Sequence, residues 1–272
     1  MSSPSPVPPG ACDCHMHVFE DRFALAPTAT FTPPHAPADA YRKVQQALGL
    51  SRVVVVQPTG YAFDNRCTLE AMAALGPEAR AIVVVAPGTS EAELGRLDAL
   101  GVRGVRYMML PGGVLGWESL DATAARIDAH SWNINLQLDG RDLPAREAML
   151  LRLRSRLAID HIGKFLGPTT TESAAFASLC RLLDRGRCWI KLSAPYESSK
   201  SGPPDYADVA PLARSLAERY PERCLWASNW PHPNTSPLPS EQALLEWTDR
   251  CIGNAASRQK ILVDNAAVLY RF

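Results

Sequence analysis

The sequence predicts a single-domain (β/α)8 barrel, an α/β architecture in which helices surround a ring of eight parallel strands. Three observations lead to this prediction. Short apolar runs rich in Val and Ile recur along the 272 residues, and several are apolar on both faces, as in strands of a buried parallel sheet. Polar stretches with apolar residues at every third or fourth position indicate helices. Eight strand-and-helix units fit a chain of this length as one domain.

The strands are expected within the apolar runs, whose short length favours strands over buried helices. In chain order these runs span residues 11–19, 51–58, 79–87, 101–110, 132–139, 156–163, 188–195 and 224–231. An open doubly wound sheet is the alternative arrangement. It is disfavoured because neither a GxGxxG nor a GxxxxGK[ST] motif follows the first run.

Helices are expected between and after these runs. They lie within residues 36–50, 89–101, 119–130, 140–155, 171–186, 206–221, 238–253 and 255–272. The first carries Asp39 as its expected N-cap and ends at Gly49. The second opens with Thr89 or Ser90 ahead of acidic residues, which is a capping signal.

Composition is that of an ordinary globular protein, with 46% hydrophobic residues, 21% charged residues and a formal net charge of zero. We therefore expect neither nucleic acid nor a membrane surface as a partner. No apolar run approaches the roughly 20 residues of a transmembrane helix. The seven scattered cysteines predict reduced thiols in a cytoplasmic protein. Residues 1–10 are proline-rich and predict a flexible arm ahead of a barrel at residues 11–272.

Polar residues gather where the expected strands end, which is where active sites form in this fold. His15 and His17 end the first strand, and alternation places them on one face together with Asp13. Two imidazoles in one space suit metal binding or acid–base chemistry. His161 ends the sixth run and Asn229 the eighth. Candidate substrate-binding residues are Gln57, Tyr61, Arg103, Arg106, Gln137, Lys191, Tyr196 and His232.

Several of these residues have a structural alternative. Arg103, Arg106 and Lys191 could receive a substrate carboxylate, and Arg106 and Lys191 could equally form internal ion pairs. Tyr61 and Tyr196 lie in loops after strands, where lining a pocket and plain packing are both open.

The motifs "DCHMHVF", "DHIGK" and "WASNWPHP", in this order, resemble the amidohydrolase superfamily and more closely its 2-pyrone-4,6-dicarboxylate lactonase group. The resemblance extends over residues 11–272. It implies a (β/α)8 barrel that acts on lactones without a metal or other cofactor. It also implies that His15, His17, His161 and the residue at position 229 form the catalytic site.

Position 229 departs from the lactonase pattern. The lactonases carry an aspartate there that activates water, whereas the amide of Asn229 has no useful acid–base behaviour. Glu197 follows Tyr196 where these lactonases tend to have an arginine, which disfavours a dicarboxylate substrate. A sister group of lactone isomerases also has asparagine at 229. That resemblance implies intramolecular conversion of a sugar-diacid 1,5-lactone into its 1,4-lactone.

The expected isomerase mechanism uses the substrate's own hydroxyl as nucleophile. His161 or His17 takes its proton, and His15 with Lys191 or Arg106 stabilises the oxyanion. Three alternatives remain open at this point. The protein could be a lactone hydrolase with Asp160, Asp139 or Glu197 as base, a metal-dependent hydrolase or decarboxylase with three histidine ligands, or a non-catalytic binder of sugar acids.

Overall fold

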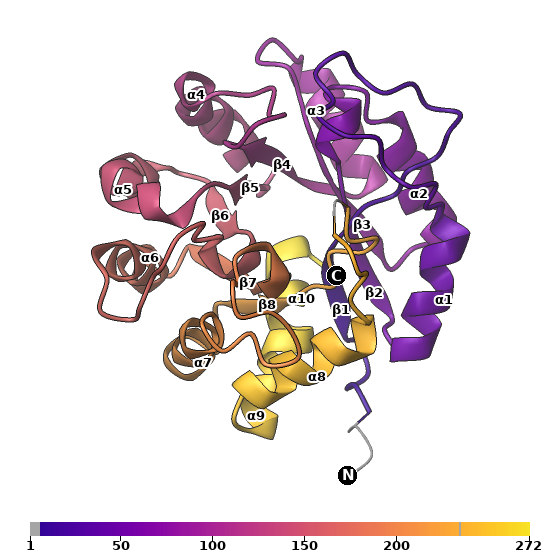
Figure 1. Cartoon of the computed structure of the whole chain (residues 1–272). Coiled ribbons are helices and arrows are strands. Elements are labelled where there is room, and N and C mark those ends of the chain that lie inside the picture. Colours follow the sequence, from indigo (N-terminus) through magenta and orange to yellow (C-terminus); the bar gives the residue numbers. More distant parts are fainter. Residues whose placement is uncertain (1–5, 234) are drawn as a thin grey trace.

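The computed structural model describes residues 6–233 and 235–272. Its eight strands form one parallel sheet in chain order that curls into a barrel, which confirms the predicted fold class (Figure 1). The strands are β1 (Cys12–Met16), β2 (Arg52–Val56), β3 (Ala79–Val83), β4 (Val102–Met108), β5 (Asn133–Gln137), β6 (Arg156–Ile159), β7 (Cys188–Leu192) and β8 (Cys224–Trp226).

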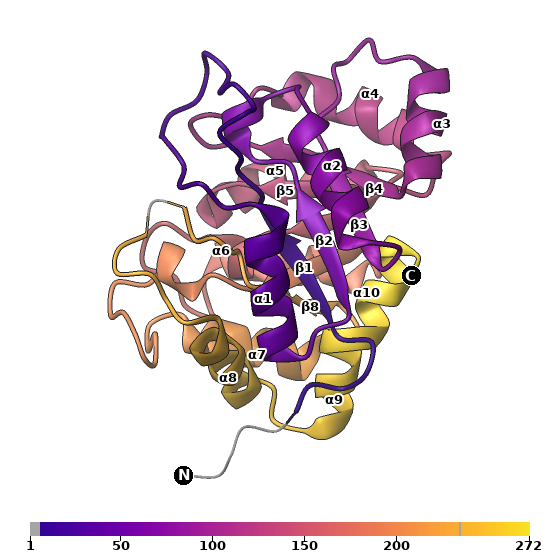
Figure 2. The same ribbon diagram turned by 90° about the vertical axis from the view of Figure 1, so that its right-hand side faces the viewer.

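Helices surround the barrel and alternate with the strands (Figures 1 and 2). They are α1 (Ala38–Leu48), α2 (Arg66–Leu75), α3 (Glu91–Leu100), α4 (Trp117–Asp128), α5 (Leu143–Arg152), α6 (Ala174–Asp184), α7 (Ala210–Arg219), α8 (Glu241–Cys251), α9 (Ala255–Gln259) and α10 (Asn265–Tyr270). The sequence pattern had assigned no helix to the segment that forms α2. The single helix expected at the C-terminal end is divided by a π-helical turn at Lys260–Asp264.

Two of the three helix caps expected from the sequence are present in the structure. Ser90 caps α3 by accepting a hydrogen bond from Glu93 N, and Gly49 ends α1 in the left-handed region. The expectation for Asp39 is wrong. Pro37 occupies the N-cap of α1, so Asp39 lies inside the first turn, where its charge still complements the helix dipole.

One end of the barrel is closed by the C-terminal helix α10. Ala266, Leu269 and Tyr270 pack against the inward-facing apolar residues of the strands. Arg80 at the start of β3 and Arg156 at the start of β6 both donate hydrogen bonds to backbone carbonyls of the α10 region. Helix α10 therefore covers the end of the barrel where the strands begin. The opposite end, where the strands finish, stays available for a functional site.

The seam between β8 and β1 is closed beyond the short strand β8. Asp13 accepts hydrogen bonds from Ser228 N at 2.9 Å and Ser228 Oγ at 2.5 Å. Asn229 N donates to His15 O at 2.9 Å, and His17 N donates to Trp230 O at 2.8 Å. These bonds align the end of the first strand with the residues after the eighth.

A register irregularity between Asp13 and Met16 interrupts β1. Asp13 bonds Tyr41 of α1, outside the ring, whereas the side chains of His15 and His17 face the interior. The expectation that Asp13 shares a face with the histidines is therefore wrong. A bulge breaks the simple alternation and redirects the side chains that follow it.

The seven cysteines are free and buried, in agreement with the predicted reduced thiols; the cytoplasmic location stays a prediction. No helix in the described part of the chain has both the length and the apolar character needed to cross a bilayer. Of the expected N-terminal arm, residues 1–5 lie outside the described residues. Pro6 and Gly10 accept hydrogen bonds from Arg258 of α9 and Arg52 of β2.

We predict that Asp13→Ala destabilises the fold by about 3 kcal/mol, because several buried donors lose their acceptor at once. Urea unfolding monitored by circular dichroism measures this change. Tyr41→Phe is the control, because it removes only the donor on α1 at 3.0 Å, and we expect a loss of about 1 kcal/mol. Equal losses in the two variants would contradict a role for Asp13 in closing the seam.

Candidate active site

A small cavity of about 100 Å³ opens at the C-terminal end of the barrel. Its polar lining comes from seven strands or the loops that follow them: His17, Thr59, Arg106, Gln137, His161, Lys164, Glu197 and Asn229. A larger hollow of about 540 Å³ borders His161 from outside, between the loops after β6 and β7. Of these two hollows, the small cavity is the one that brings together residues from the ends of most strands, so we take it as the candidate active site.

A buried ion pair lies directly beneath this cavity. Lys191 Nζ is 3.0 Å from Asp160 Oδ1 and 3.0 Å from His15 Nδ1, and it also donates to Asn135 Oδ1. Asn135 Nδ2 donates to Asp160 Oδ2 at 2.8 Å. All four side chains are fully or almost fully buried. Lys191 was predicted to bind substrate, but its three protons are already engaged below the histidines.

The electrostatic balance of this pair follows from its partners. Burial alone would raise the pKa of Asp160, but Lys191 and His15 hold it well below its usual range. Burial lowers the pKa of Lys191, and Asp160 opposes that shift. The result is a carboxylate and an ammonium group that stabilise each other inside the barrel.

The hydrogen bonds assign the tautomers of the two histidines of β1. Burial, reinforced by Arg106, lowers the pKa of His17 to about 3, so this ring is neutral. Its Nδ1 lies 2.8 Å from Val56 O and must donate there, which leaves Nε2 as an acceptor. His15 Nε2, at 3.2 Å, is the donor to it. His15 Nδ1 lies between two partners, Lys191 Nζ at 3.0 Å and Asp160 Oδ1 at 3.2 Å, and in the neutral ring it accepts from Lys191.

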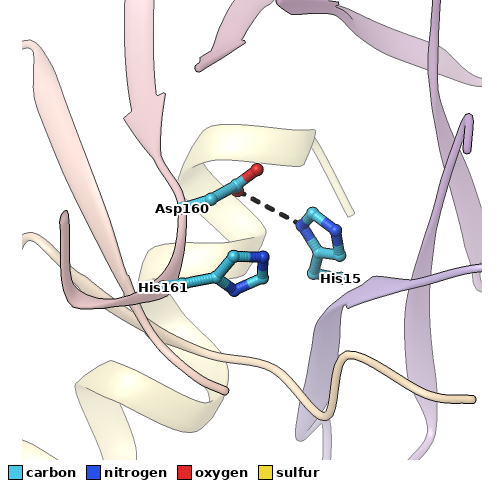
Figure 3. Close-up of side chains that lie close together, drawn as sticks. All are labelled: His15, Asp160 and His161. Atoms are coloured by element: carbon cyan, nitrogen blue, oxygen red, sulfur yellow. Dashed lines mark hydrogen bonds and ion pairs between the residues drawn. The ribbon is translucent and has the colours of Figure 1, made fainter. Parts of the chain in front are cut away.

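A metal site is disfavoured by the charge of Lys191. Among the described residues, His15, Asp160 and His161 form a group whose possible ligand atoms lie within 4.8 Å of one another (Figure 3). His15 Nδ1 lies 3.2 Å from Asp160 Oδ1, which could accept a proton from Nδ1 and leave Nε2 for a metal. The Lys191 ammonium, 3.0 Å from both Nδ1 and Oδ1, would compete with a metal for the Asp160 carboxylate and would repel the ion.

His161 is the imidazole with a nitrogen free for substrate. Its Nδ1 lies 2.9 Å from Ser193 Oγ, and either tautomer satisfies this bond because the hydroxyl can donate or accept. Its Nε2 has no protein partner within the described chain, and the residue lines the cavity. Burial lowers the pKa of His161 to about 4, so the ring is neutral and can accept a proton. Figure 3 shows it beside His15.

Arg106 provides the fixed positive charge of the cavity. Its Nη1 donates to Gln57 O at 2.7 Å and its Nη2 to Gln137 Oε1 at 2.8 Å, whereas Nε has no hydrogen-bond partner in the protein. The side chain is only 6% exposed. Gln137 therefore orients the guanidinium, and both residues lie where the sequence placed them.

Asn229 lies across the cavity from Arg106 and is tied to the loop after β7. Its Nδ2 donates to Tyr196 OH at 2.9 Å and to Glu197 Oε1 at 3.0 Å. Glu197 in turn forms an ion pair with Lys164. Sequence reasoning treated Glu197 as a departure from the lactonases and as a possible base of a hydrolase, and it did not single out Lys164. The lysine of the "DHIGK" motif was the available signal.

Three residues predicted to bind substrate do not line the cavity. Arg103 lies near the start of β4, at the other end of the barrel, where it pairs with Asp98. Tyr61 is buried, and its hydroxyl bonds backbone groups of Glu20. The Gln57 side chain bonds backbone carbonyls of the loop after β2. The structure does not bring these three side chains into the cavity, because position on a strand or loop does not fix the direction of a side chain.

Tyr196 and His232 support Asn229 from behind. Tyr196 OH lies 2.8 Å from His232 Nδ1, and His232 Nε2 lies 3.4 Å from Glu241 of α8. Neither residue borders the cavity, so their predicted contact with substrate is replaced by contact with Asn229.

Several residues of this site have backbone conformations in the left-handed region. The φ angles are 52° at His161, 44° at Lys164, 62° at Asn229 and 58° at His232. Such angles cost non-glycine residues free energy and persist where surrounding contacts impose them. Their concentration after β6 and β8 supports a functional role for these strand ends.

Comparison with known proteins agrees with this geometry. A family model described as amidohydrolase matches residues 12–272. The chain belongs to the amidohydrolase family. It is 37% identical to D-galactarolactone isomerase of Agrobacterium fabrum, over 99% of this chain and 94% of that protein. It is 33% identical to a 2-pyrone-4,6-dicarboxylate hydrolase of Comamonas testosteroni, over 97% and 91% of the two chains.

Among solved amidohydrolase structures, an Agrobacterium tumefaciens protein in its apo form superposes with a TM-score of 0.93. Its chain is 36% identical, and the match covers 98% of this chain and 97% of that one. The relatives include both an isomerase and a hydrolase of lactones, so the family relationship leaves the choice between these two reactions to the site itself.

We predict that the free energy of unfolding falls steeply as the pH drops below about 6.5. The unfolded histidines become protonated there, whereas burial keeps His15, His17 and His161 neutral in the folded state. Each contributes about 1.4 kcal/mol per pH unit near pH 5. Denaturant unfolding between pH 5 and 8 measures the slope. His161→Asn should reduce it by about 1.4 kcal/mol per unit, and the surface variant His35→Asn is the control; an unchanged slope in His161→Asn would contradict the prediction.

Proposed function

We propose that the protein is a lactone isomerase that converts D-galactaro-1,5-lactone into D-galactaro-1,4-lactone by intramolecular acyl transfer and without a metal. One observation carries the proposal: the strand-end residue that faces the cavity at position 229 is an amide whose NH2 group is already engaged. The similarity to D-galactarolactone isomerase supports the same choice.

An amide suits isomerisation because this reaction needs no activated water. The C4 hydroxyl of the substrate is tethered close to the lactone carbonyl, and such tethering reaches effective molarities of about 10⁵ M or more. A carboxylate that was ionised and able to act as a base at this position would activate water and divert the lactone to the open-chain diacid. Asn229 can hold a hydroxyl in place, but it cannot take its proton.

The positions of the side chains suggest the steps. The C4 oxygen attacks C1 and passes its proton to His161 Nε2, the nitrogen without a protein partner. The oxyanion on the carbonyl oxygen is stabilised by the Arg106 guanidinium. The bond between C1 and the ring oxygen at C5 then breaks, and His161 returns the proton to that oxygen. No atom is gained or lost, in keeping with an isomerisation.

Two roles expected from the sequence are revised in this mechanism. His15 was expected to stabilise the oxyanion together with Lys191 or Arg106, but its Nε2 is engaged with His17 and its Nδ1 with Lys191. His17 was an alternative base, but its Nε2 already accepts from His15. The pair instead forms the polar floor beneath His161 and Arg106.

Lactone hydrolysis is the second candidate, because Glu197 places a carboxylate on the cavity wall. Its engagement by Lys164 and Asn229 weakens it as a base. The other carboxylates considered are also paired, Asp160 with Lys191 and Asp139 with Arg141.

The free carboxylate of a sugar-diacid lactone would face the positive charges of Arg106 and Lys164.

We predict that the protein converts D-galactaro-1,5-lactone into the 1,4-lactone without net proton release. Carbon NMR of the mixture identifies the product, and a pH-stat run in parallel detects hydrolysis, which releases one proton per turnover. Pretreatment with a chelator should leave the rate unchanged. Product formation no faster than in buffer, or loss of rate that zinc restores, would refute the proposal.

We predict that Arg106→Gln lowers kcat by about 100-fold, because loss of one transition-state donor costs about 2.7–4 kcal/mol. Steady-state kinetics with the same lactone measure the effect. Arg103→Gln on the same strand is the matched control, since Arg103 bonds Asp98 at the opposite end of the barrel. A similar loss in both variants would assign the effect to the strand and not to the cavity.

A further inference from the structure

The amide of Asn229 has only one orientation compatible with its neighbours. Burial opposes ionisation of Glu197, but Lys164 and the hydrogen bond from Asn229 hold its pKa below the usual range, so it is a carboxylate and can only accept hydrogen bonds. The atom of Asn229 at 3.0 Å from Glu197 Oε1 must therefore be Nδ2. The same Nδ2 donates to Tyr196 OH, and both amide protons are used.

The carbonyl oxygen is what remains for the cavity. Asn229 Oδ1 has no protein partner among the residues that the structure describes, and the residue lines the cavity wall. The backbone of Asn229 is fixed as well, because its N–H donates to His15 O at 2.9 Å across the seam. The side chain cannot exchange its two ends without placing Oδ1 against the Glu197 carboxylate.

We propose that Glu197 is a positioning residue that determines the reaction: it turns the carbonyl oxygen of Asn229 toward the substrate and prevents a carboxylate at position 229 from acting as a base. Its effect on the substrate rests on the proposed isomerase function. Its effect on position 229 is independent of any substrate.

The first consequence concerns hydrogen bonding. With its NH2 group engaged, Asn229 presents an acceptor, which suits the hydrogen of a substrate hydroxyl and not a carbonyl oxygen. It can align the attacking or the leaving hydroxyl, whereas the carbonyl oxygen is left to Arg106. The cavity thus has a hydrogen-bond acceptor in the carbonyl oxygen of Asn229 and a hydrogen-bond donor in the guanidinium of Arg106.

The second consequence concerns charge. A carboxylate at position 229 would place one of its oxygens about where Nδ2 lies, 3.0 Å from Glu197 Oε1. Two carboxylates at that separation cannot both ionise readily, so one retains a proton. A protonated acid does not activate water. Replacing Asn229 by aspartate alone would therefore not reproduce the hydrolytic site.

The titratable and charged groups around position 229 come from six elements of the fold. Glu197 and Tyr196 belong to the loop after β7, and His161 and Lys164 to the loop after β6. His17 of β1 and Arg106 of β4 complete the cavity, and His232 with Glu241 lies behind Tyr196. Among them, Glu197 is the group whose negative charge opposes a carboxylate at 229 at hydrogen-bond distance.

The decisive experiment measures the introduced carboxyl group directly in the full-length protein without substrate. Asn229→Asp and the double variant Asn229→Asp/Glu197→Gln are labelled with carboxyl-¹³C aspartate, and each new resonance is titrated. We expect its pKa above the ordinary aspartate value of about 3.9 in the single variant and lower by about one unit or more in the double variant. Equal pKa values would overturn the proposal. Melting curves confirm that both variants fold.

A third variant reverses the expected shift. Lys164→Met, combined with Asn229→Asp, removes the cation that compensates Glu197, and the introduced carboxyl group should titrate at higher pH than in the single variant. A decrease or no change would show that the pair does not control the charge at this position.

Turnover tests the orientation of the amide. In Glu197→Leu the side chain of Asn229 is free to rotate, and isomerisation should fall about tenfold, whereas Glu197→Gln keeps an acceptor oxygen and should restore most of the rate. The ratio of hydrolysis to isomerisation should rise more in Asn229→Asp/Glu197→Gln than in Asn229→Asp. Equal rates in the two Glu197 variants would refute the orienting role. If no variant and no parent protein turns over the lactone, the proposed function fails while the titration still decides the role of Glu197.

Discussion

Closure of the barrel between β8 and β1 is the constraint on which the site depends. Strand β8 is only three residues long, so the seam is completed beyond it by the Asp13 carboxylate and by two backbone hydrogen bonds that join residues 15 and 17 to residues 229 and 230. These bonds place the residue at 229 opposite the histidines of β1. The bulge in β1 serves the same end, because it sends Asp13 outward to seal the seam while His15 turns inward.

The buried ion pair of Lys191 and Asp160 influences the protonation of the two imidazoles above it, those of His15 and His17. Lys191 donates to His15, His15 to His17 and His17 to a backbone carbonyl, so two imidazoles are held neutral with their protons assigned. His161 stands outside this chain with one nitrogen free. The cavity therefore has an accessible imidazole, the cation of Arg106 and the ion pair of Lys164 with Glu197.

Sequence patterns were sufficient for the fold and for the residues that end strands on the inner face. His17, His161, Gln137 and Asn229 could be placed because parallel strands end at a common edge. Strand position alone did not separate Arg103 from Arg106. These residues are three apart on one strand, so their side chains point to opposite faces of the sheet and lie toward different ends of the barrel. Lys191 faces inward but lies too deep. The contact of Asn229 with Glu197 joins loops after different strands, and no periodic pattern encodes such a contact.

The chemistry of this scaffold is therefore a property of a group of side chains and not of position 229 alone. An isomerase and a hydrolase of lactones are both relatives of this chain, and the barrel, the seam and the buried ion pair are compatible with either reaction. In the proposed mechanism, the two reactions differ in whether the strand-eight residue can hold a negative charge at neutral pH. That depends on Glu197, which lies 3.0 Å away in space on a different loop. The Glu197 carboxylate favours a neutral side chain at position 229. The amide of Asn229 in turn needs the Glu197 acceptor to fix its orientation.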